Sequence, residues 1–130
     1  MIGILIPAHN EQALLAECLD AALKAARHPD LLGETVQILV MLDSCSDGSA
    51  AIVQAYPVQC LEVQARNVGH ARGVGARHLL DLGARWIACT DADSRVAPDW
   101  LVAQLALEAD AVCGTVTVDA WSEGFDPAAQ

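Results

Sequence analysis

Strand-length apolar runs alternate with helical segments along this chain, and this order constrains the fold more than any other feature. The first run covers residues 2–7, and the apolar residues after it, from Leu14 to Ala26, recur at the period of a helix. Strands that are apolar on both faces and alternate with helices predict an α/β fold with a mainly parallel, Rossmann-like sheet, covered by helices on both faces. The further strands are expected at 36–42, 58–63, 86–90 and 111–118, and the further helices near 52, over 69–82 and over 100–107.

Three residues suggest where the helices begin and end. Asn10 can cap the first helix through its side-chain oxygen. Gly83 is expected to end the helix over 69–82, because glycine adopts the left-handed conformation common at helix ends. Pro98 suits the first turn of the following helix, where its missing N–H is not needed.

Polar clusters follow the carboxyl ends of four of these strands. Ligands of open α/β sheets bind at that edge, so the four clusters are expected to converge on one site. They read PAHNE at 7–11, DSCSDGS at 43–49, RNVGHAR at 66–72 and DADS at 91–94.

The last cluster carries the chemistry most clearly, because an apolar strand ends there in Asp91 and Asp93. Side chains two residues apart in an extended backbone point the same way, roughly 6–7 Å apart. Two such carboxylates can share a divalent cation or divide a metal and a sugar between them. Either acid alone is also typical of a solvated strand end or a helix cap.

Charge restricts the ligand. The net charge of −10 argues against a general nucleic-acid or anionic-membrane binder, which needs clustered basic residues. The basic residues are nevertheless unevenly spread, since five of the seven lie between positions 66 and 95, around the two acids. An anionic ligand is therefore expected at this place. These five residues are Arg66, Arg72, Arg77, Arg85 and Arg95.

The five cysteines are scattered, odd in number and without a C-x-x-C pair, which favours reduced thiols and a cytoplasmic protein. No stretch approaches the roughly 18 apolar residues that span a bilayer, and the N-terminal run lacks the basic start of a signal peptide. An anchor beyond residue 130 would place a longer protein at the inner face of a membrane.

The four clusters, in this order and at these spacings, resemble the nucleotide-sugar-binding half of the family 2 glycosyltransferases, which have the GT-A fold. The resemblance covers roughly residues 2–118, and four motifs in register are far more specific than any one of them. It implies that Asp43 contacts the uracil or ribose of a UDP-sugar and that Asp93 coordinates Mg²⁺ or Mn²⁺ on the diphosphate. The other nucleotide-sugar-binding residues that it implies are Pro7, Ala8, Asn10, Glu11, Asn67, Arg72 and Asp91.

Two departures from the family pattern leave alternatives open. Many relatives have two acids where this chain has Asp43 followed by Ser44, and Asp43 could instead serve only a turn. Gly75 stands where the family often has Asn, so Arg72, His70 and Arg66 all remain candidates for the contact with the phosphates.

The function expected from the resemblance is inverting, metal-dependent transfer of a sugar from a nucleotide diphosphate donor to an unknown acceptor. Residues 1–118 would form the donor-binding domain, and 119–130 a tail or the start of a missing acceptor region. No catalytic base can be assigned, since Glu123 and Asp126 lie in no recognisable context. A fragment is expected to expose an apolar flank near 111–118 and to self-associate. The rival interpretation is a non-catalytic nucleotide-sugar-binding module or remnant.

Other classes that use similar sheets fit less well. A haloacid-dehalogenase-like phosphatase carries D-x-D-x-T on its first strand, whereas here the motif comes fourth and reads DADSR. A dinucleotide-binding oxidoreductase needs G-x-G-x-x-G after the first strand, where this chain has PAHNE. The same segment replaces the glycine-rich loop of a nucleotidyltransferase.

Overall fold

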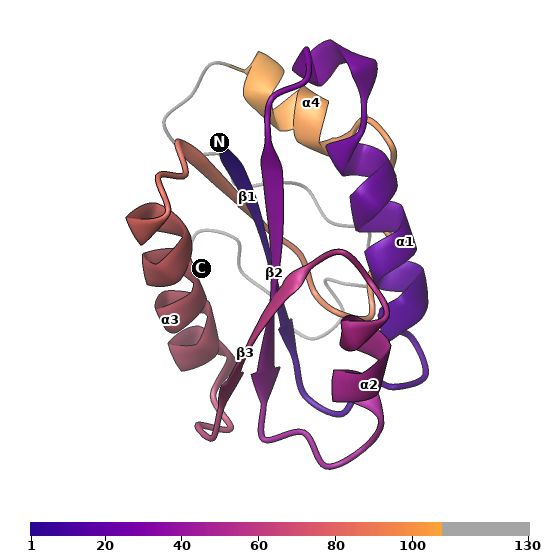
Figure 1. The fold of residues 1–130 in the computed structure, drawn as a ribbon, viewed down its shortest axis with the longest axis vertical. Coiled ribbons are helices and arrows are strands. Elements are labelled where there is room, and N and C mark those ends of the chain that lie inside the picture. The colour runs from indigo at the N-terminus through magenta and orange to yellow at the C-terminus, as the bar shows by residue number, and fades with distance from the viewer. Residues whose placement is uncertain (108–130) are drawn as a thin grey trace.

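The structure is a computed structural model, and it describes residues 1–107. These residues form a parallel sheet between two layers of helices (Figure 1). The elements follow one another in strict strand–helix order. They are β1 (Ile2–Ala8), α1 (Leu15–Ala26), the short 3-10 helix η1 (Pro29–Leu31), β2 (Val36–Asp43), α2 (Ser49–Gln54), β3 (Gln59–Val63), α3 (Val68–Asp81), β4 (Trp86–Cys89) and α4 (Trp100–Ala106).

The strand order is β3-β2-β1-β4, and every pairing is parallel. Ile2 of β1 stands in register with Val36 of β2 on one side and with Trp86 of β4 on the other. All four strands therefore end at the same edge of the sheet, at the lower end of Figure 1, where the arrowheads of β1 and β2 point. The predicted α/β class with a mainly parallel sheet is confirmed.

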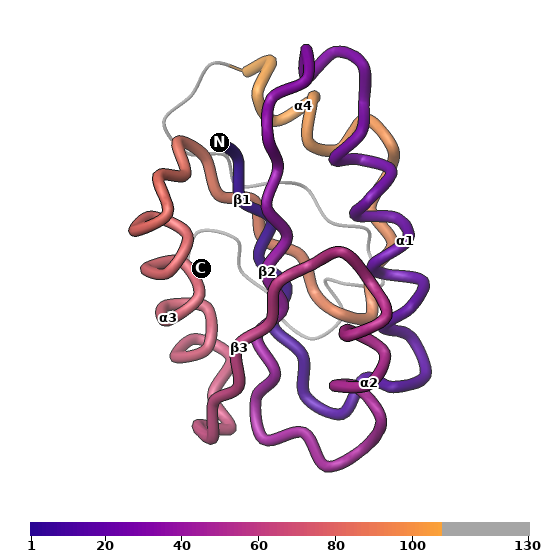
Figure 2. The backbone as a smooth tube through the Cα atoms, viewed as in Figure 1, coloured from indigo at the N-terminus to yellow at the C-terminus, as the bar shows by residue number. Residues whose placement is uncertain are grey.

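The two faces of the sheet are covered unequally. Ile2, Ile4 and Ile6 pack with α1, α2 and α4 on one face, whereas Leu5 packs with α3 on the other. Figure 2 shows the same division, with α3 alone on the left of the sheet and the other helices on the right. Because successive side chains of β1 alternate between the two clusters, the whole strand is buried, as its continuous apolar run predicts.

The single helix on the second face lies very close to the sheet. Its inward stripe is Ala71, Gly75 and Leu79, all buried. A Cβ atom built at Gly75 would lie 2.9 Å from Met41 Cγ and still closer to Leu5 Cδ1. Gly75 thus fits a helix–sheet contact in which any side chain would clash.

Several predicted boundaries change. Asn10 does not cap α1, so that prediction is wrong: the helix begins at Leu15 after a turn in which Leu14 and Leu15 donate to the Glu11 carbonyl. Gly83 does follow the end of α3, with φ +100°, as expected. Pro98 lies in the turn before α4, one residue ahead of the N-cap Asp99. The expected strand at 111–118, the tail 119–130 with Glu123 and Asp126, and the apolar flank lie outside the described residues.

Within residues 1–107 no helix is long and apolar enough to cross a membrane. The four cysteines of this range, Cys18, Cys45, Cys60 and Cys89, are free thiols.

Candidate functional site

Four loops meet at the carboxyl edge of the sheet, and we call residues 9–12, 44–49, 64–67 and 90–95 together the polar edge. Asn10, Ser44 and Arg66 each follow one of the first three strands and have positive φ, at 51°, 54° and 47°. Non-glycine residues avoid this conformation unless the surroundings hold them there, and such residues cluster at functional sites.

The loops after β1 and β2 are bound to each other. Asn10 Oδ1 accepts hydrogen bonds from the backbone N–H groups of Ser46 at 2.8 Å and Asp47 at 3.3 Å. Gln12 closes the contact from the other side, since its N–H donates to Asp47 Oδ2 and its Oε1 accepts from Gly48 N. Figure 2 shows these two loops side by side below the sheet. Asn10 therefore shapes the site by joining two loops rather than by capping a helix.

The loops after β2 and β3 are joined by Asp43. This residue is 4% exposed, and its Oδ1 accepts from the N–H groups of Ala65 at 2.9 Å and Arg66 at 2.8 Å. Oδ2 accepts from Asn67 N at 2.8 Å, and the Ser44 hydroxyl donates to Oδ1 at 3.0 Å. A carboxylate has about four acceptor positions. Hydrogen bonds from the protein itself therefore occupy nearly all acceptor positions of Asp43.

These contacts also set the charge of Asp43. Burial works to raise the pKa of its carboxyl, but the backbone hydrogen bonds from Arg66, Asn67 and Ala65 outweigh burial and lower the pKa to about 2. Asp43 is therefore ionised at neutral pH, and its charge fixes the loop that leads into α3. Asn67 then caps that helix, since its Oδ1 accepts from His70 N at 3.0 Å.

The two acids after β4 differ in their surroundings. Asp91 Oδ1 accepts a hydrogen bond from Arg72 Nη2 at 2.9 Å, which joins the loop after β4 to α3. Asp93 is exposed and forms no ion pair with any residue of 1–107. Arg66 and His70, the other candidates for a phosphate contact, are also exposed.

Glu11 completes an acidic group at this place. Burial raises the pKa of its carboxyl, and the nearby charges of Asp93, Asp47 and Asp91 raise it further. The same surroundings act on Cys18 of α1, where burial, followed by Asp93 and Asp91, raises the thiol pKa to about 12. Carboxylates that repel one another in this way would gain from a cation among them.

The structure thus brings most of the predicted site residues to one edge. Asn10, Glu11, Asp43, Asn67, Arg72, Asp91 and Asp93 all lie on it or contact it. Pro7 and Ala8 are buried at the end of β1 and support the edge from beneath, where the Ala8 carbonyl accepts from Cys45 Sγ at 3.5 Å.

Sequence reasoning missed the residues that bind the loops together. Asp47 Oδ1 accepts from Ser49 N and from the Ser49 hydroxyl, and Ser49 Oγ in turn accepts from Glu11 N. His9 Nδ1 lies 2.7 Å from the Asp43 carbonyl oxygen. The clusters 7–11 and 43–49 contain all of these residues, but the sequence shows only the Asp-Gly-Ser turn and not the contacts that join the two loops.

A divalent cation fits the chemistry of this edge without a complete protein cage. Residues 1–107 contain no group of three or more His, Cys, Asp or Glu side chains that could hold a metal ion alone. Mg²⁺ and similar ions, however, are commonly held by one or two carboxylates together with phosphate oxygens and water. The exposed Asp93 offers such a carboxylate.

Comparison with known proteins identifies relatives of the chain. The family model described as Glycosyl transferase family 2 matches residues 3–130. The succinoglycan biosynthesis protein ExoO of Rhizobium meliloti (strain 1021) is 29% identical over 121 residues, which are 91% of this chain and 32% of that protein. The galactofuranosyltransferase GlfT1 of Mycolicibacterium smegmatis is 32% identical over 109 residues, 81% of this chain and 34% of that protein. The chain thus spans about a third of the length of these relatives.

A solved structure has the same arrangement of strands and helices. A mannosyltransferase of Pyrobaculum calidifontis, solved in complex with GDP-Man and Mn²⁺, matches 80% of this chain and 31% of its own with a TM-score of 0.66. The sequence identity of that match is 23%, so the likeness shows the fold.

Proposed function

This chain belongs to glycosyl transferase family 2. We therefore propose that its polar edge binds the nucleotide diphosphate of a sugar donor, by preference a UDP-sugar. The observation that carries the proposal is the D-x-D pair, Asp91 and Asp93, at the end of β4, on an edge to which three other polar loops are bound. The fold is the expected GT-A type, as the solved glycosyltransferase structures of the same shape indicate.

In this proposal, different residues of the polar edge contact different parts of the sugar donor. The nucleoside lies against the loop after β1, with Asn10 and Glu11, and against the loop 65–67 that Asp43 holds. Asn67 and the amino end of α3 face the diphosphate, where a helix N-terminus favours negative charge. Asp91 accepts a hydrogen bond from a ribose hydroxyl through the carboxylate oxygen that does not accept from Arg72.

Asp93 is the proposed ligand of Mg²⁺ or Mn²⁺. Its exposure, its lack of an ion pair within residues 1–107 and the raised pKa of Glu11 beside it all favour a cation there. When bound, the metal neutralises charge on the departing diphosphate without proton transfer. The mannosyltransferase of similar fold was solved with Mn²⁺ and GDP-Man, which supports this assignment.

The reaction that we propose for the complete protein is inverting transfer of the sugar to an acceptor. Inversion places the acceptor hydroxyl on the face of the sugar opposite the diphosphate, and a base must lie within hydrogen-bond reach of that hydroxyl. The described residues supply a donor site, and the chain spans only about a third of its relatives. A non-catalytic nucleotide-sugar-binding module is the second candidate, since the site built from residues 1–107 is a donor site without an assigned base.

Titration calorimetry of the 130-residue chain with UDP and with GDP, each in Mn²⁺, in Mg²⁺ and in EDTA, tests the donor site. We expect binding of UDP in either metal, weaker binding of GDP, and strong loss of both in EDTA. Absence of binding to any nucleotide diphosphate in the presence of metal contradicts the proposal. Assays of sugar transfer by the complete protein separate the enzyme from the non-catalytic module.

A further inference from the structure

The D-x-D motif is tied to α3 by one arginine. Arg72 Nη2 donates to Asp91 Oδ1 at 2.9 Å, and the arginine side chain is 16% exposed, against 41% for the aspartate. The arginine is therefore the more enclosed partner of the pair. Such charge-assisted hydrogen bonds are among the strongest in proteins.

The packing of α3 explains why Arg72 stays in this position. Ala71 and Gly75, on either side of it along the helix, are buried against the sheet, and Gly75 allows the close approach. Arg72 Nε is also buried and has no hydrogen-bond partner among the described residues. A guanidinium enclosed on this side cannot turn toward a diphosphate without breaking its hydrogen bond to Asp91.

The ion pair makes the two acids of the motif unequal. Arg72 engages one oxygen of Asp91, which leaves the other oxygen for a hydrogen bond from a ligand. Asp93 is exposed to solvent and has no ion-pair partner within residues 1–107. Of two otherwise equivalent carboxylates, one is thus prepared for a neutral hydroxyl and the other for a cation.

We propose that Arg72 is a positioning residue of the donor site: it orients Asp91 toward the nucleoside and leaves Asp93 as the metal ligand, and it does not itself bind the phosphates. The proposal rests on the donor-binding function proposed above and deepens it. Of the three candidates for the contact with the phosphates, Arg72, Arg66 and His70, the proposal removes Arg72 and leaves Arg66 or His70.

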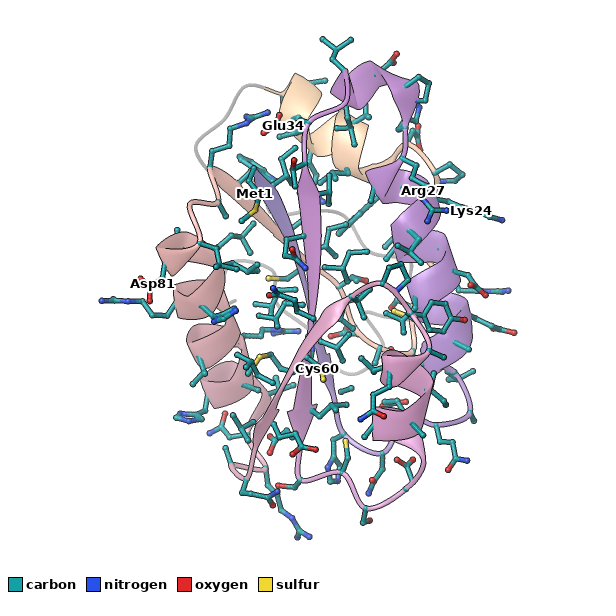
Figure 3. The ribbon with its side chains drawn as sticks, in the orientation of Figure 1. Met1, Lys24, Arg27, Glu34, Cys60 and Asp81 are labelled. Carbon is teal, nitrogen blue, oxygen red and sulfur yellow. The ribbon has the colours of Figure 1, made fainter. Side chains whose placement is uncertain are left out.

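Uridine and UDP together test the proposal, because uridine has the ribose but no phosphate. The dissociation constants of both are measured in Mn²⁺ for the wild-type chain, for R72Q and R72K, and for R77Q as the matched control. Arg77 lies on the same helix, but its side chain is 80% exposed and its ion-pair partner within residues 1–107 is Asp81. Figure 3 shows Asp81 on the outer side of α3. We expect R72Q to weaken uridine and UDP by the same factor, roughly tenfold, the loss of one charge-assisted hydrogen bond. R72K, which keeps the charge, recovers part of this loss, and R77Q changes neither.

A double-mutant cycle shows whether Arg72 acts through Asp91. If it does, R72Q combined with D91N binds uridine no more weakly than D91N alone. A loss in R72Q that is confined to UDP makes Arg72 a phosphate ligand and overturns the proposal, as does unchanged binding of both ligands. The carboxyl ¹³C resonance of Asp91 in the ligand-free protein gives an independent readout, which should shift in R72Q and not in R77Q. If the wild type binds neither ligand, the donor function fails, while this resonance still decides whether Arg72 holds Asp91.

Discussion

At the scale of single residues, the acids of the polar edge do different work because their partners differ. Both oxygens of Asp43 accept hydrogen bonds from the protein, whereas only one oxygen of Asp91 accepts from Arg72. The side chain of Asp93 is exposed to solvent. Similar carboxylates at one edge can therefore serve structure, ligand orientation and metal binding.

Asp93→Asn tests the open carboxylate. The expected result is that UDP with Mn²⁺ raises the melting temperature of the wild type but leaves the variant nearly unchanged, because the amide is a poor ligand for the metal. For the wild type, ligand at 100 times its dissociation constant stabilises by about 2.7 kcal/mol, which a thermal scan detects readily. Asp99→Asn, an exposed position at the start of α4, is the control. Equal stabilisation of Asp93→Asn and the wild type would show that the metal binds elsewhere.

Asp43→Asn tests the filled carboxylate. The amide presents an NH₂ group to N–H donors, so we expect faster hydrogen exchange at Ala65, Arg66 and Asn67 and binding of UDP and GDP weakened alike, on the order of tenfold or more. Hydrogen exchange followed by mass spectrometry and calorimetry measure the two effects. Glu62→Gln, on the exposed side of β3, should change neither. A loss for UDP alone would instead support the direct contact with the base that the family resemblance implies, which stays a prediction.

At the scale of elements, the position of α3 decides where Arg72 and Asn67 lie. Gly75→Ala should destabilise the chain by about 1–3 kcal/mol, because the added methyl group overlaps Leu5 and Met41 in a packed core. Gly73→Ala is the matched control on the same helix: nothing lies within 4 Å of the place that its added methyl group would take, so it should stabilise by about 0.5–1 kcal/mol. Urea denaturation measures both. A neutral Gly75→Ala would show that α3 can move away from the sheet at little cost.

The elements themselves were predictable from the sequence, and the connections between them were not. Long apolar runs identified β1, β2 and β4, because a buried parallel strand leaves few alternatives for such residues. The start of α1 was placed too early because Asn10, a good capping residue, is used instead to bind the loop after β2. Likewise, the D-x-D pair was recognised, but its ion pair with Arg72 joins residues 19 apart, and such contacts leave no local pattern.

At the scale of the whole molecule, three acids of residues 1–107 have lowered pKa values, and Glu34 and Asp43 are the two whose pKa falls to about 2. The side-chain hydrogen bond from Arg85 lowers the pKa of Glu34 to about 2, and the loop 65–67 does the same for Asp43 despite the opposing effect of burial. Glu34 also pairs with the Met1 ammonium at 3.3 Å, and Figure 3 shows both residues at the end of the sheet away from the polar edge. A carboxyl whose pKa is lower in the folded state contributes stability above its ordinary pKa and loses it as the pH falls through the folded value.

We therefore expect the urea midpoint to fall as the pH drops from about 4.5 to about 2, the window between the ordinary and the folded pKa values. Glu34→Gln should lower the midpoint at pH 7 and make a smaller difference at pH 2, where about half of the wild-type carboxyl is protonated. Glu17→Gln is the control, since Glu17 is 59% exposed and lies 3.8 Å from Arg95. A pH-independent effect of Glu34→Gln would contradict the role of its charge.

The 130-residue chain is also expected to separate binding from transfer. We expect it to bind UDP in Mn²⁺ and to show at most slow hydrolysis of a UDP-sugar, because the proposed donor site lies within residues 1–107 and we propose no base among them. Quantification of released UDP and of glycosylated acceptor measures the two reactions. Transfer at the roughly 1–10³ s⁻¹ usual for enzymes would contradict this expectation and point to Glu123 or Asp126 as the base.

The hydrogen bonds of Asp43 have a consequence for the order of folding. Its partners Ala65, Arg66 and Asn67 lie 22, 23 and 24 residues further along the chain. Closing so long a segment costs entropy, which the pairing of β2 with β3 helps to offset, so we expect the carboxylate to meet its donors once these strands have paired. In refolding, recovery of ligand binding should therefore come no earlier than recovery of the sheet.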